Sequence, residues 1–541
     1  MLNFIVFLSV LIFVHELGHF LVAKACGVKV LKFSIGFGPR LIGFTRGETE
    51  YQIALLPFGG YVKMAGEQPY DEVAPEEAER GFLTQPAWKR VLISAAGPVF
   101  NLAFPVLVFF VVFMGPQKVW STRVANVEPG MPAAEAGMQP GDRIIAIDGN
   151  RVRAFPEIRR ELQSRFQQPV PITVERDGKQ LVLTVSPVRN LDVSPIETVP
   201  QGMIGIGPVA LPAEVGVPPG SPAEAAGLKT FDRIVAIDGK PVKDETELKP
   251  ALAGKSGTVE VKVARFDEVP LPGVVARAPR VVSVNVPVQP GEGYAALGTE
   301  RVDLYVRGVE PGSPVDKAGV KRGDRIVAID GKPLPSALLL SIALNEHGDK
   351  PFKLTWRSAG EEKSAQLAQA RVEVKDEFNS GQTELSTGLW PHAYTRAEQT
   401  EPESVTLQYT VGEAMAESLK VVPDVIRQTA LGIAKLFTGG ISAKSVGGPV
   451  MLYDLANRSA EAGFAPFLRM MAVISVNLGL MNLLPIPVLD GFHILSATWE
   501  GIRRRPISLR AREVANMVGL AMLLLLMGWA LLNDILRRMA S

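Results

Sequence analysis

Three residues near the N-terminus have types and a spacing suited to binding a metal ion. They are His15, Glu16 and His19, in the segment LIFVHELGHFLVAKACG, residues 11–27. Residues four positions apart share one face of an α-helix, so the two imidazoles can bind one cation. Glu16 lies beside them and can take a proton from a zinc-bound water, whose pKa falls to about 7. The alternative is that these polar residues pack inside a helix bundle without a metal.

The surrounding sequence favours the metal-binding interpretation. The apolar run at residues 2–25 is long enough to span a bilayer core, which needs about 20 residues. An ionisable side chain at the bilayer centre costs about 3 kcal/mol without a partner, so such residues mark function by default. The chain has five histidines in all, and two of them fall in this one segment.

A third metal ligand is expected from another span, because a catalytic zinc ion usually has three protein ligands and one open position. The late apolar segment SVNLGLMNLLPIPVLDGFHIL, residues 475–495, has Asp490 as its only carboxylate. Pro485 and Pro487 interrupt a regular helix there and let the aspartate turn inward. His493 is the rival ligand. We favour Asp490, because its negative charge offsets the cation and two histidines with one carboxylate form a known hydrolytic zinc set.

Four windows are apolar and long enough to cross a membrane. They lie at residues 2–25, 91–114, 467–489 and 514–533. The first window lacks the basic start and the small-residue cleavage site of a signal peptide, so we expect it to be retained as a span.

Basic residues in the short loops predict the orientation of these spans. They are Lys29, Lys32, Arg40, Arg46, Lys63, Lys89, Arg90, Arg503, Arg504, Arg505, Arg510 and Arg512. Four spans put both basic loops on the same side, which we expect to be cytoplasmic. Residues 115–465 and both termini then lie outside.

Composition limits the classes of protein that this chain can represent. Its 541 residues are enough for several domains. The formal net charge of +1 provides no global attraction to nucleic acid. Cys26 is the single cysteine, which excludes an intramolecular disulfide.

Three segments between the second and third spans align without gaps. They read VEPGMPAAEAGMQPGDRIIAIDGNRV from Val127, VPPGSPAEAAGLKTFDRIVAIDGKPV from Val217 and VEPGSPVDKAGVKRGDRIVAIDGKPL from Val309. A period of about 90 residues exceeds that of solenoid repeats, so each unit can be a small domain with its own core. Each segment predicts a turn, a short helix and a strand that ends in a tight DG turn. Phe231 replaces the glycine of the other two copies, which leaves open a different turn there.

These three units resemble the bacterial PDZ domain. PDZ domains bind extended peptides by adding them as a strand to a sheet edge. The alternative is that the units are spacers or steric filters that bind no peptide.

A predicted β-hairpin follows the first span. FSIGFGPRLIGF and EYQIALLPFGGYVKM, within residues 33–66, indicate strands with glycine turns. Non-helical backbone is tolerated at membrane depth where it lines a cavity. We hypothesise that this hairpin pairs with a substrate as an added strand, the alternative being an ordinary cytoplasmic hairpin.

The segment at residues 412–437 predicts an amphipathic helix. It contains four charged residues beyond its first turns and Pro423, which make a membrane span costly. Its apolar spacing fits a helix that lies against the outer membrane face or the protein.

The motifs together resemble the site-2 protease family of intramembrane metalloproteases, in particular its bacterial RseP (regulator of sigma-E protease) type. The resemblance rests on HExxH in the first span, NLLPIPVLDG in a late span and the PDZ-like units between them. GPVFN at 97–101 and LPFGGYVKMAGE at 56–67 extend it over nearly the whole chain. Two departures stand out: relatives usually carry two PDZ copies, and Phe492 stands where glycine is common.

The resemblance implies a multi-span α-helical membrane protein. It has four transmembrane helices, a membrane-associated β-hairpin or sheet after the first, and three inserted α/β PDZ domains. It implies that His15, His19 and Asp490 bind Zn²⁺ and that Glu16 is the catalytic acid/base. The implied substrate-binding residues are Asn477, Asn482, Pro485, Pro487, Gly59 and Gly60.

The expected domains follow from these assignments. They are residues 1–114 with the first two spans, 118–200, 202–290 and 300–395 as PDZ domains, 405–465 as an amphipathic helical region, and 466–541 with the last two spans. The expected location is the bacterial cytoplasmic (inner) membrane, with the PDZ domains on the extracytoplasmic side.

The implied activity is that of a zinc-dependent intramembrane endopeptidase. It would cleave transmembrane segments of membrane proteins already trimmed outside, such as anti-sigma factors or signal-peptide remnants, in regulated intramembrane proteolysis. The implied partners are single-span substrates, the lipid bilayer and peptide or protein ligands of the PDZ domains, with no nucleic acid.

Two other functions compete with proteolysis. A catalytically silent membrane-anchored PDZ scaffold would have lost a ligand or the glutamate, and neither is missing. A zinc transporter would need more intramembrane acids or histidines than these spans supply, and it gives the three repeats no task.

Overall fold

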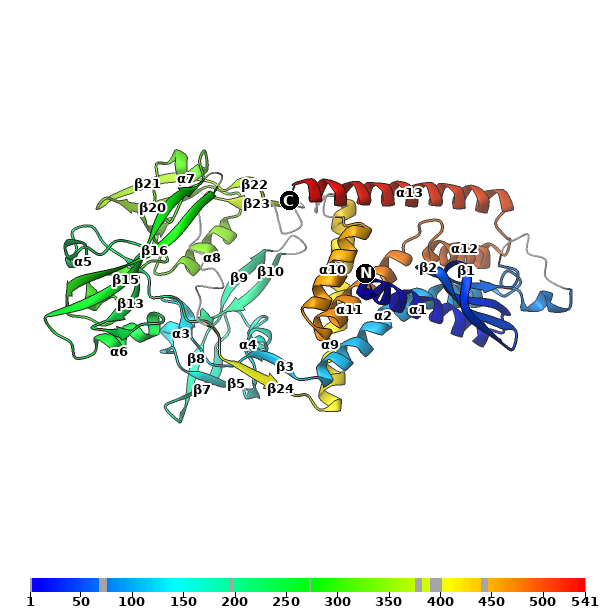
Figure 1. The fold of residues 1–541 in the computed structure, drawn as a ribbon, viewed down its shortest axis with the longest axis horizontal. Coiled ribbons are helices and arrows are strands. Elements are labelled where there is room, and N and C mark those ends of the chain that lie inside the picture. The colour runs from blue at the N-terminus through cyan, green and yellow to red at the C-terminus, as the bar shows by residue number, and fades with distance from the viewer. Residues whose placement is uncertain are drawn as a thin grey trace. The chain divides into compact units, whose positions relative to one another are not determined.

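The computed structural model describes residues 2–67, 75–193, 198–271, 274–374, 382–389, 401–438 and 446–540 (Figure 1). The chain forms two compact units, and each is described by itself. The first is Met1–Gln117, Lys375–Gln382 and Gln408–Ser541, and the second is Lys118–Val374 and Thr383–Leu407.

Helices dominate the first unit, which contains the predicted spans. Its α-helices are α1 (Leu2–Ala25), α2 (Ala87–Met114), α9 (Val411–Thr438), α10 (Pro449–Glu461), α11 (Phe464–Asn482), α12 (Asp490–Arg503) and α13 (Leu509–Ala540), with a short 3₁₀ helix, η1, at Pro75–Arg80. Four segments have the length and composition of membrane spans, namely Leu2–Ala25, Ala87–Met114, Phe464–Asn482 and Arg510–Met539. The prediction of four helices long and apolar enough to span a membrane is confirmed among the described residues.

The predicted third span, residues 467–489, is wrong at its C-terminal end. The helix α11 ends at Asn482, and regular helix resumes only at Asp490. Pro485 and Pro487 lack a backbone N–H and disfavour helical geometry in the residue before them, which keeps the intervening segment out of the helix. Val488 has a φ of 84°, in the left-handed region. The break predicted from the prolines is therefore real, and the span is shorter than the apolar pattern.

The helix α2 packs against α1, α9, α11 and α12. Small and polar residues join it to α11: a Cβ at Gly479 would lie 3.0 Å from the carbonyl oxygen of Pro98, and Ser475 donates a hydrogen bond of 2.8 Å to the carbonyl of Asn101. On the other side of the bundle, Phe7 and Leu11 of α1 are buried against α10 and α11. These contacts fix α1 and α11 relative to α2.

The predicted hairpin is present after α1. It consists of β1 (Val30–Arg46) and β2 (Thr49–Met64), which pair in antiparallel fashion with shifts of register between Val30 and Ile42. Its inner residues Phe33 and Val62 are buried in one cluster with Ala23 of α1 and Ile93 of α2. The hairpin is therefore part of the same packed body as the two helices.

The helix α9 confirms the predicted helix at 412–437. It runs from Val411 to Thr438 with Pro423 inside it, and it is not among the candidate spans of the described residues. Its inner residue Val422 packs with Val108 and Phe109 of α2.

The second unit contains the three sequence repeats, and each has its own cluster of buried hydrophobic residues. Each repeat forms a four-stranded sheet, in the orders β6-β5-β7-β8, β14-β13-β15-β16 and β19-β18-β20-β21. The strands of these sheets are β5 (Arg143–Ile147), β6 (Asn150–Arg151), β7 (Val170–Arg176), β8 (Lys179–Val185), β13 (Arg233–Ile237), β14 (Lys240–Pro241), β15 (Thr258–Leu271), β16 (Val274–Pro287), β18 (Arg325–Ile329), β19 (Lys332–Pro333), β20 (Phe352–Ser358) and β21 (Glu361–Leu367).

Short helices accompany these sheets, as the repeats predict. The helices are α3 (Pro132–Glu135), α4 (Phe155–Leu162), α5 (Pro222–Ala226), η2 (Glu245–Glu247), α6 (Leu248–Leu252), η3 (Ala295–Leu297), α7 (Pro314–Lys317) and α8 (Ala337–His347). The remaining strands are β3 (Gln117–Trp120), β4 (Asn126–Val127), β9 (Val188–Val193), β10 (Thr198–Met203), β11 (Ile206–Gly207), β12 (Val215–Gly216), β17 (Glu300–Arg301), β22 (Ala370–Val374), β23 (Gln382–Ser386) and β24 (Ser404–Leu407).

The turn at Phe231 does not differ from its counterparts. Phe231 has a φ of 75°, close to the 99° of Gly141 and the 91° of Gly323. A bulky side chain is strained in this region, so surrounding contacts must hold it there. The guanidinium groups of Arg307 and Arg322 lie 4.9 and 5.5 Å from the centre of its ring. Phe231 thus joins the second repeat to the third.

Strand pairing extends the first two repeats past the domain limits predicted from the sequence. β11 pairs with β4, so the first repeat extends to Gly207, and β17 pairs with β12, so the second extends to Arg301. Arg301 is an ion-pair partner of Glu128 in the first repeat at 3.4 Å and of Glu245 in the second at 3.8 Å. The predicted end of the third domain, residues 390–395, lies outside the described residues.

Candidate metal centre

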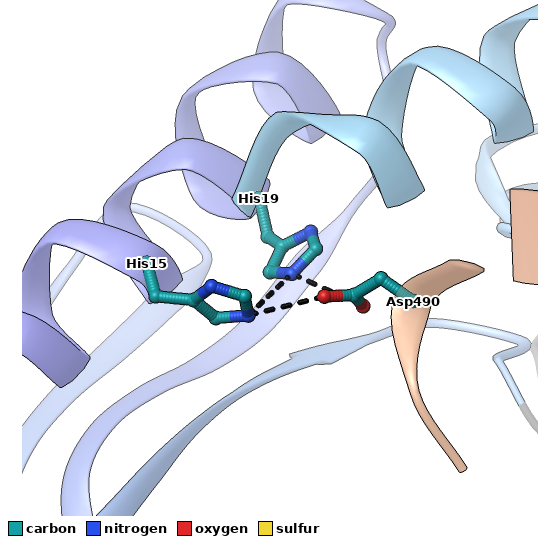
Figure 2. Close-up of side chains that lie close together, drawn as sticks. All are labelled: His15, His19 and Asp490. Atoms are coloured by element: carbon teal, nitrogen blue, oxygen red, sulfur yellow. Dashed lines mark hydrogen bonds and ion pairs between the residues drawn. The ribbon is translucent and has the colours of Figure 1, made fainter. Parts of the chain in front are cut away.

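Two distant parts of the chain meet at His15, His19 and Asp490. Figure 2 shows the two imidazoles on neighbouring turns of α1 and the carboxylate of Asp490, the first residue of α12, pointing toward them. His15 Nε2 lies 3.2 Å from Asp490 Oδ2, and His19 Nε2 lies 3.4 Å from Asp490 Oδ1. The two Nε2 atoms are 3.2 Å apart.

The donor atoms fit a zinc ion in both chemistry and spacing. Zinc binds nitrogen and carboxylate oxygen at about 2.0–2.2 Å in tetrahedral geometry, which separates neighbouring ligand atoms by about 3.3 Å. The two Nε2 atoms are 3.2 Å apart, and each lies 3.2–3.4 Å from a different oxygen of the Asp490 carboxylate. The set matches the two histidines and one carboxylate of hydrolytic zinc sites, which leave a fourth position open.

A second layer of hydrogen bonds orients both imidazoles. His19 Nδ1 lies 2.8 Å from the carbonyl oxygen of Ile93, so Nδ1 carries the proton and Nε2 presents its lone pair. His15 Nδ1 lies 3.0 Å from the side-chain amide of Asn101. The Oδ1 of this amide is buried without a partner among the described residues, and a half-turn of the amide makes it the acceptor for His15 Nδ1–H. Both rings then present Nε2 to the same point.

Glycines allow α1 and α2 to approach each other at this site. A Cβ at Gly97 would lie 2.3 Å from His19 Nε2 and 2.8 Å from His15 Cε1. A Cβ at Gly18 would lie 2.5 Å from the carbonyl oxygen of Ala96. No side chain fits at either position, so the spacing of the imidazoles depends on both glycines.

Glu16 and the hairpin share a cavity with the three donor residues. The cavity has a volume of about 690 Å³ and is lined by His15, Glu16, His19 and Asp490 together with Gly60 and Asn482. The carboxylate of Glu16 accepts a hydrogen bond from the backbone N–H of Val62 in β2. A Cβ at Gly60 would lie 3.1 Å from Glu16 Cγ, so the strand passes close to the Glu16 side chain.

The structure brings together some of the predicted substrate-binding residues but not all. Asn482 and Gly60 line the cavity, and Asn482 Nδ2 lies 3.4 Å from His15 Nε2. The other predicted residues are not part of the lining formed by the described residues: Asn477, Pro485, Pro487 and Gly59. His493, the rival ligand, lines the cavity but does not belong to the cluster of three donors.

Sequence reasoning assigned no role to Asn101, Gly97 or the carbonyl of Ile93. The first two lie in the GPVFN segment, which was noted only as a resemblance. The sequence signals that could have indicated these roles were an amide and a glycine inside an apolar span. The amide is informative because polar residues in membrane spans need partners. The contact of a backbone carbonyl with His19 leaves no signal in the sequence.

Comparisons with known proteins identify the family to which the chain belongs. The model of the family described as Peptidase family M50 matches residues 3–526. A Neisseria meningitidis protein that is named as a zinc metalloprotease is 31% identical over 540 residues, 99% of each chain. The regulator of sigma-E protease RseP of Salmonella typhimurium is 30% identical, and that of Escherichia coli 29%, each over 536 residues, 99% of this chain and 98% of the relative. The chain therefore belongs to peptidase family M50, a family of zinc-dependent metallopeptidases.

Proposed function

We propose that this chain is an intramembrane endopeptidase in which His15, His19 and Asp490 hold the zinc ion and Glu16 is the catalytic acid/base. One observation carries the proposal: the donor atoms of α1 and of the start of α12 lie 3.2–3.4 Å apart, beside a carboxylate, within a bundle of candidate membrane spans.

The metal, Glu16 and Val62 have separate roles in the proposed hydrolysis. Zinc, when bound, supplies Lewis acidity that polarises a peptide carbonyl and makes water a better nucleophile at neutral pH. Glu16 accepts the proton of the attacking water and passes it to the leaving nitrogen. The N–H of Val62 holds the Glu16 carboxylate at the cavity wall, which keeps it in reach of both reacting groups.

The hairpin supports the substrate. Peptide bonds in a transmembrane helix are already hydrogen-bonded and shielded, so the helix has to unwind before hydrolysis. Gly60 of β2 lines the cavity, and hydrophobic side chains on the outer part of the hairpin are exposed, among them Phe44 and Ile42. We assign to β2 the role of pairing with the unwound substrate as an added strand.

The three repeats are assigned as PDZ domains, which admit substrates already trimmed on their side of the membrane. The substrates are single-span membrane proteins such as anti-sigma factors or signal-peptide remnants, and the location is the bacterial inner membrane with the repeats outside. Each repeat has its own core and a four-stranded sheet, and an extended peptide can add as a strand to the edge of such a sheet. The names of the RseP relatives support regulated proteolysis.

The alternative is a catalytically silent scaffold. The test compares zinc content and cleavage of a model transmembrane substrate for the wild type, Glu16→Gln and His15→Ala. We expect wild type and Glu16→Gln to contain zinc but only wild type to cleave, whereas His15→Ala loses both. Equal cleavage by wild type and Glu16→Gln at full zinc content would reject the proposal.

A further inference from the structure

A second cavity lies at the start of α2, and its walls are strongly basic. It has a volume of about 440 Å³ and is lined by four arginines and one carboxylate, namely Arg90, Arg504, Arg505, Arg512 and Glu500. The Glu500 side chain is 5% exposed and accepts from Arg90 at 2.7 Å and from Arg512. One carboxylate thus faces four guanidinium groups, and the cavity keeps a surplus of positive charge.

Two of these arginines have no anionic partner among the described residues. Arg504 and Arg505 follow the last turn of α12, and both are exposed. Arg504 has a φ of 54°, a left-handed conformation that few non-glycine residues adopt. Deeper in the wall, Arg90 Nε is buried and has no hydrogen-bond partner among the described residues. Hydrogen-bond donors without a partner thus lie both at the surface of the cavity and deeper in its wall, which favours an anion as its ligand.

An apolar groove continues from the basic cavity. Ala87 and Gly501 line both, and the groove, of about 500 Å³, is otherwise formed by Trp88, Val91, Leu92, Thr498 and Ile502. Trp88 is 59% exposed and Ile502 is 75% exposed. Such exposed side chains are stable when hydrocarbon rather than water covers them.

The cavity and groove lie where membrane spans begin. Ala87 is the first residue of one candidate span, and another starts at Arg510, two residues before Arg512. Tryptophan is enriched at this boundary, and basic pockets between spans bind the anionic headgroups of lipids. The N-terminus of α2 adds to the positive potential, because no described side chain caps it.

We propose that this pair of cavities binds an anionic phospholipid, with the phosphate among Arg504, Arg505 and Arg512 and an acyl chain along Trp88 and Ile502. The site adjoins the metal centre, because Arg90 and Arg512 line the 690 Å³ cavity as well. The bound lipid holds α12, which carries Asp490 at its first residue, against α2.

The experiment titrates the purified full-length chain in detergent with phosphatidylglycerol or phosphatidylcholine of identical acyl chains and counts bound lipid by native mass spectrometry. We expect phosphatidylglycerol to bind preferentially. Each arginine near an anionic headgroup contributes enough to lower affinity about fivefold when lost, so Arg505→Gln binds about fivefold and Arg504→Gln/Arg505→Gln about 30-fold more weakly. Arg510→Gln is the matched control, since it removes the same charge at the start of α13, outside the cavity lining, and should leave binding unchanged.

Two further measurements distinguish a lipid ligand from a soluble phosphate ligand. Ile502→Gln should weaken phosphatidylglycerol binding, and glycerol 1-phosphate should fail to displace the lipid. Equal affinity of the double variant and wild type would overturn the proposal, as would equal binding of the two lipids. If glycerol 1-phosphate displaced the lipid fully and Ile502→Gln bound phosphatidylglycerol as wild type does, the ligand would be a soluble anion. That result would also overturn the proposal.

Discussion

Gly97→Ala should weaken zinc binding although it adds only one methyl group. The new Cβ would lie 2.3 Å from His19 Nε2, whereas an ordinary contact begins at 3.4 Å, so the ring or α1 must move by about 1.1 Å. Metal–ligand distances tolerate about 0.2 Å, so a shift of this size removes His19 from the donor set. Because overpacking of this kind costs about 1–3 kcal/mol, we expect zinc affinity to fall about 10- to 100-fold.

The higher helix propensity of alanine stabilises the folded protein, so this gain in stability has to be separated from the loss of zinc affinity. Replacing glycine by alanine inside a helix stabilises it by about 1 kcal/mol. Gly528 of α13 is a matched control, because nothing lies within 4 Å of a Cβ placed there. Gly528→Ala should raise the melting temperature and leave zinc affinity unchanged.

The assay is competition for zinc between the purified protein and a chelator of known affinity, followed by thermal melting without metal. Wild-type zinc affinity in Gly97→Ala would refute the reasoning, since it would mean that α1 and α2 can separate without disturbing the imidazoles. An equal loss of affinity in Gly528→Ala would also refute it.

Three further predictions follow from the same contacts. Asn101→Ala should lower zinc affinity about 10- to 100-fold, because His15 Nδ1 loses the partner that orients its ring, and chelator competition measures this. Ile53→Pro, in the strand segment 52–55, should block cleavage of a transmembrane substrate while zinc content stays at the wild-type value; unchanged turnover would exclude strand pairing. Hydrogen bonds from Arg80 and Lys24 lower the pKa of Glu48 from 4.5 to about 2. Its stabilisation is therefore present above pH 4.5 and lost as the pH falls toward 2, so the difference in melting temperature between wild type and Glu48→Gln should shrink over that range.

The sequence predicted the local elements well because each carries its own periodic signal. The first helix has the predicted limits, residues 2–25, since the mainly apolar run ends at Lys24 and a glycine follows Cys26. The hairpin was predicted from two strand-like segments with glycine turns. The repeat strands were predicted from alternation and from the DG turns that follow them. In the first of these turns, Asp148 and Gly149 have φ angles of 51° and 79°. These features depend only on neighbouring residues.

Contacts between distant segments were predicted less completely. That Asp490 faces His15 and His19 was expected from its charge, from the prolines before it and from the usual ligand set, but the roles of Asn101 and the Ile93 carbonyl depend on how α2 crosses α1. The left-handed conformation of Phe231 was also missed, because the arginines that hold it come from the third repeat. Propensity reports the cost of such a conformation but not the contacts that offset it.

The position of Asp490 depends on a glycine next to it rather than on the apolar residue that follows. A Cβ at Gly491 would lie 2.3 Å from the carbonyl oxygen of Leu484 and 2.4 Å from that of Leu483, so the segment after α11 folds back onto the first turn of α12. That close approach turns the aspartate toward α1. The side chain of Phe492, the next residue, lines the cavity instead. Phe492 therefore shapes the cavity wall, whereas the close approach at Gly491 sets the backbone that aims Asp490.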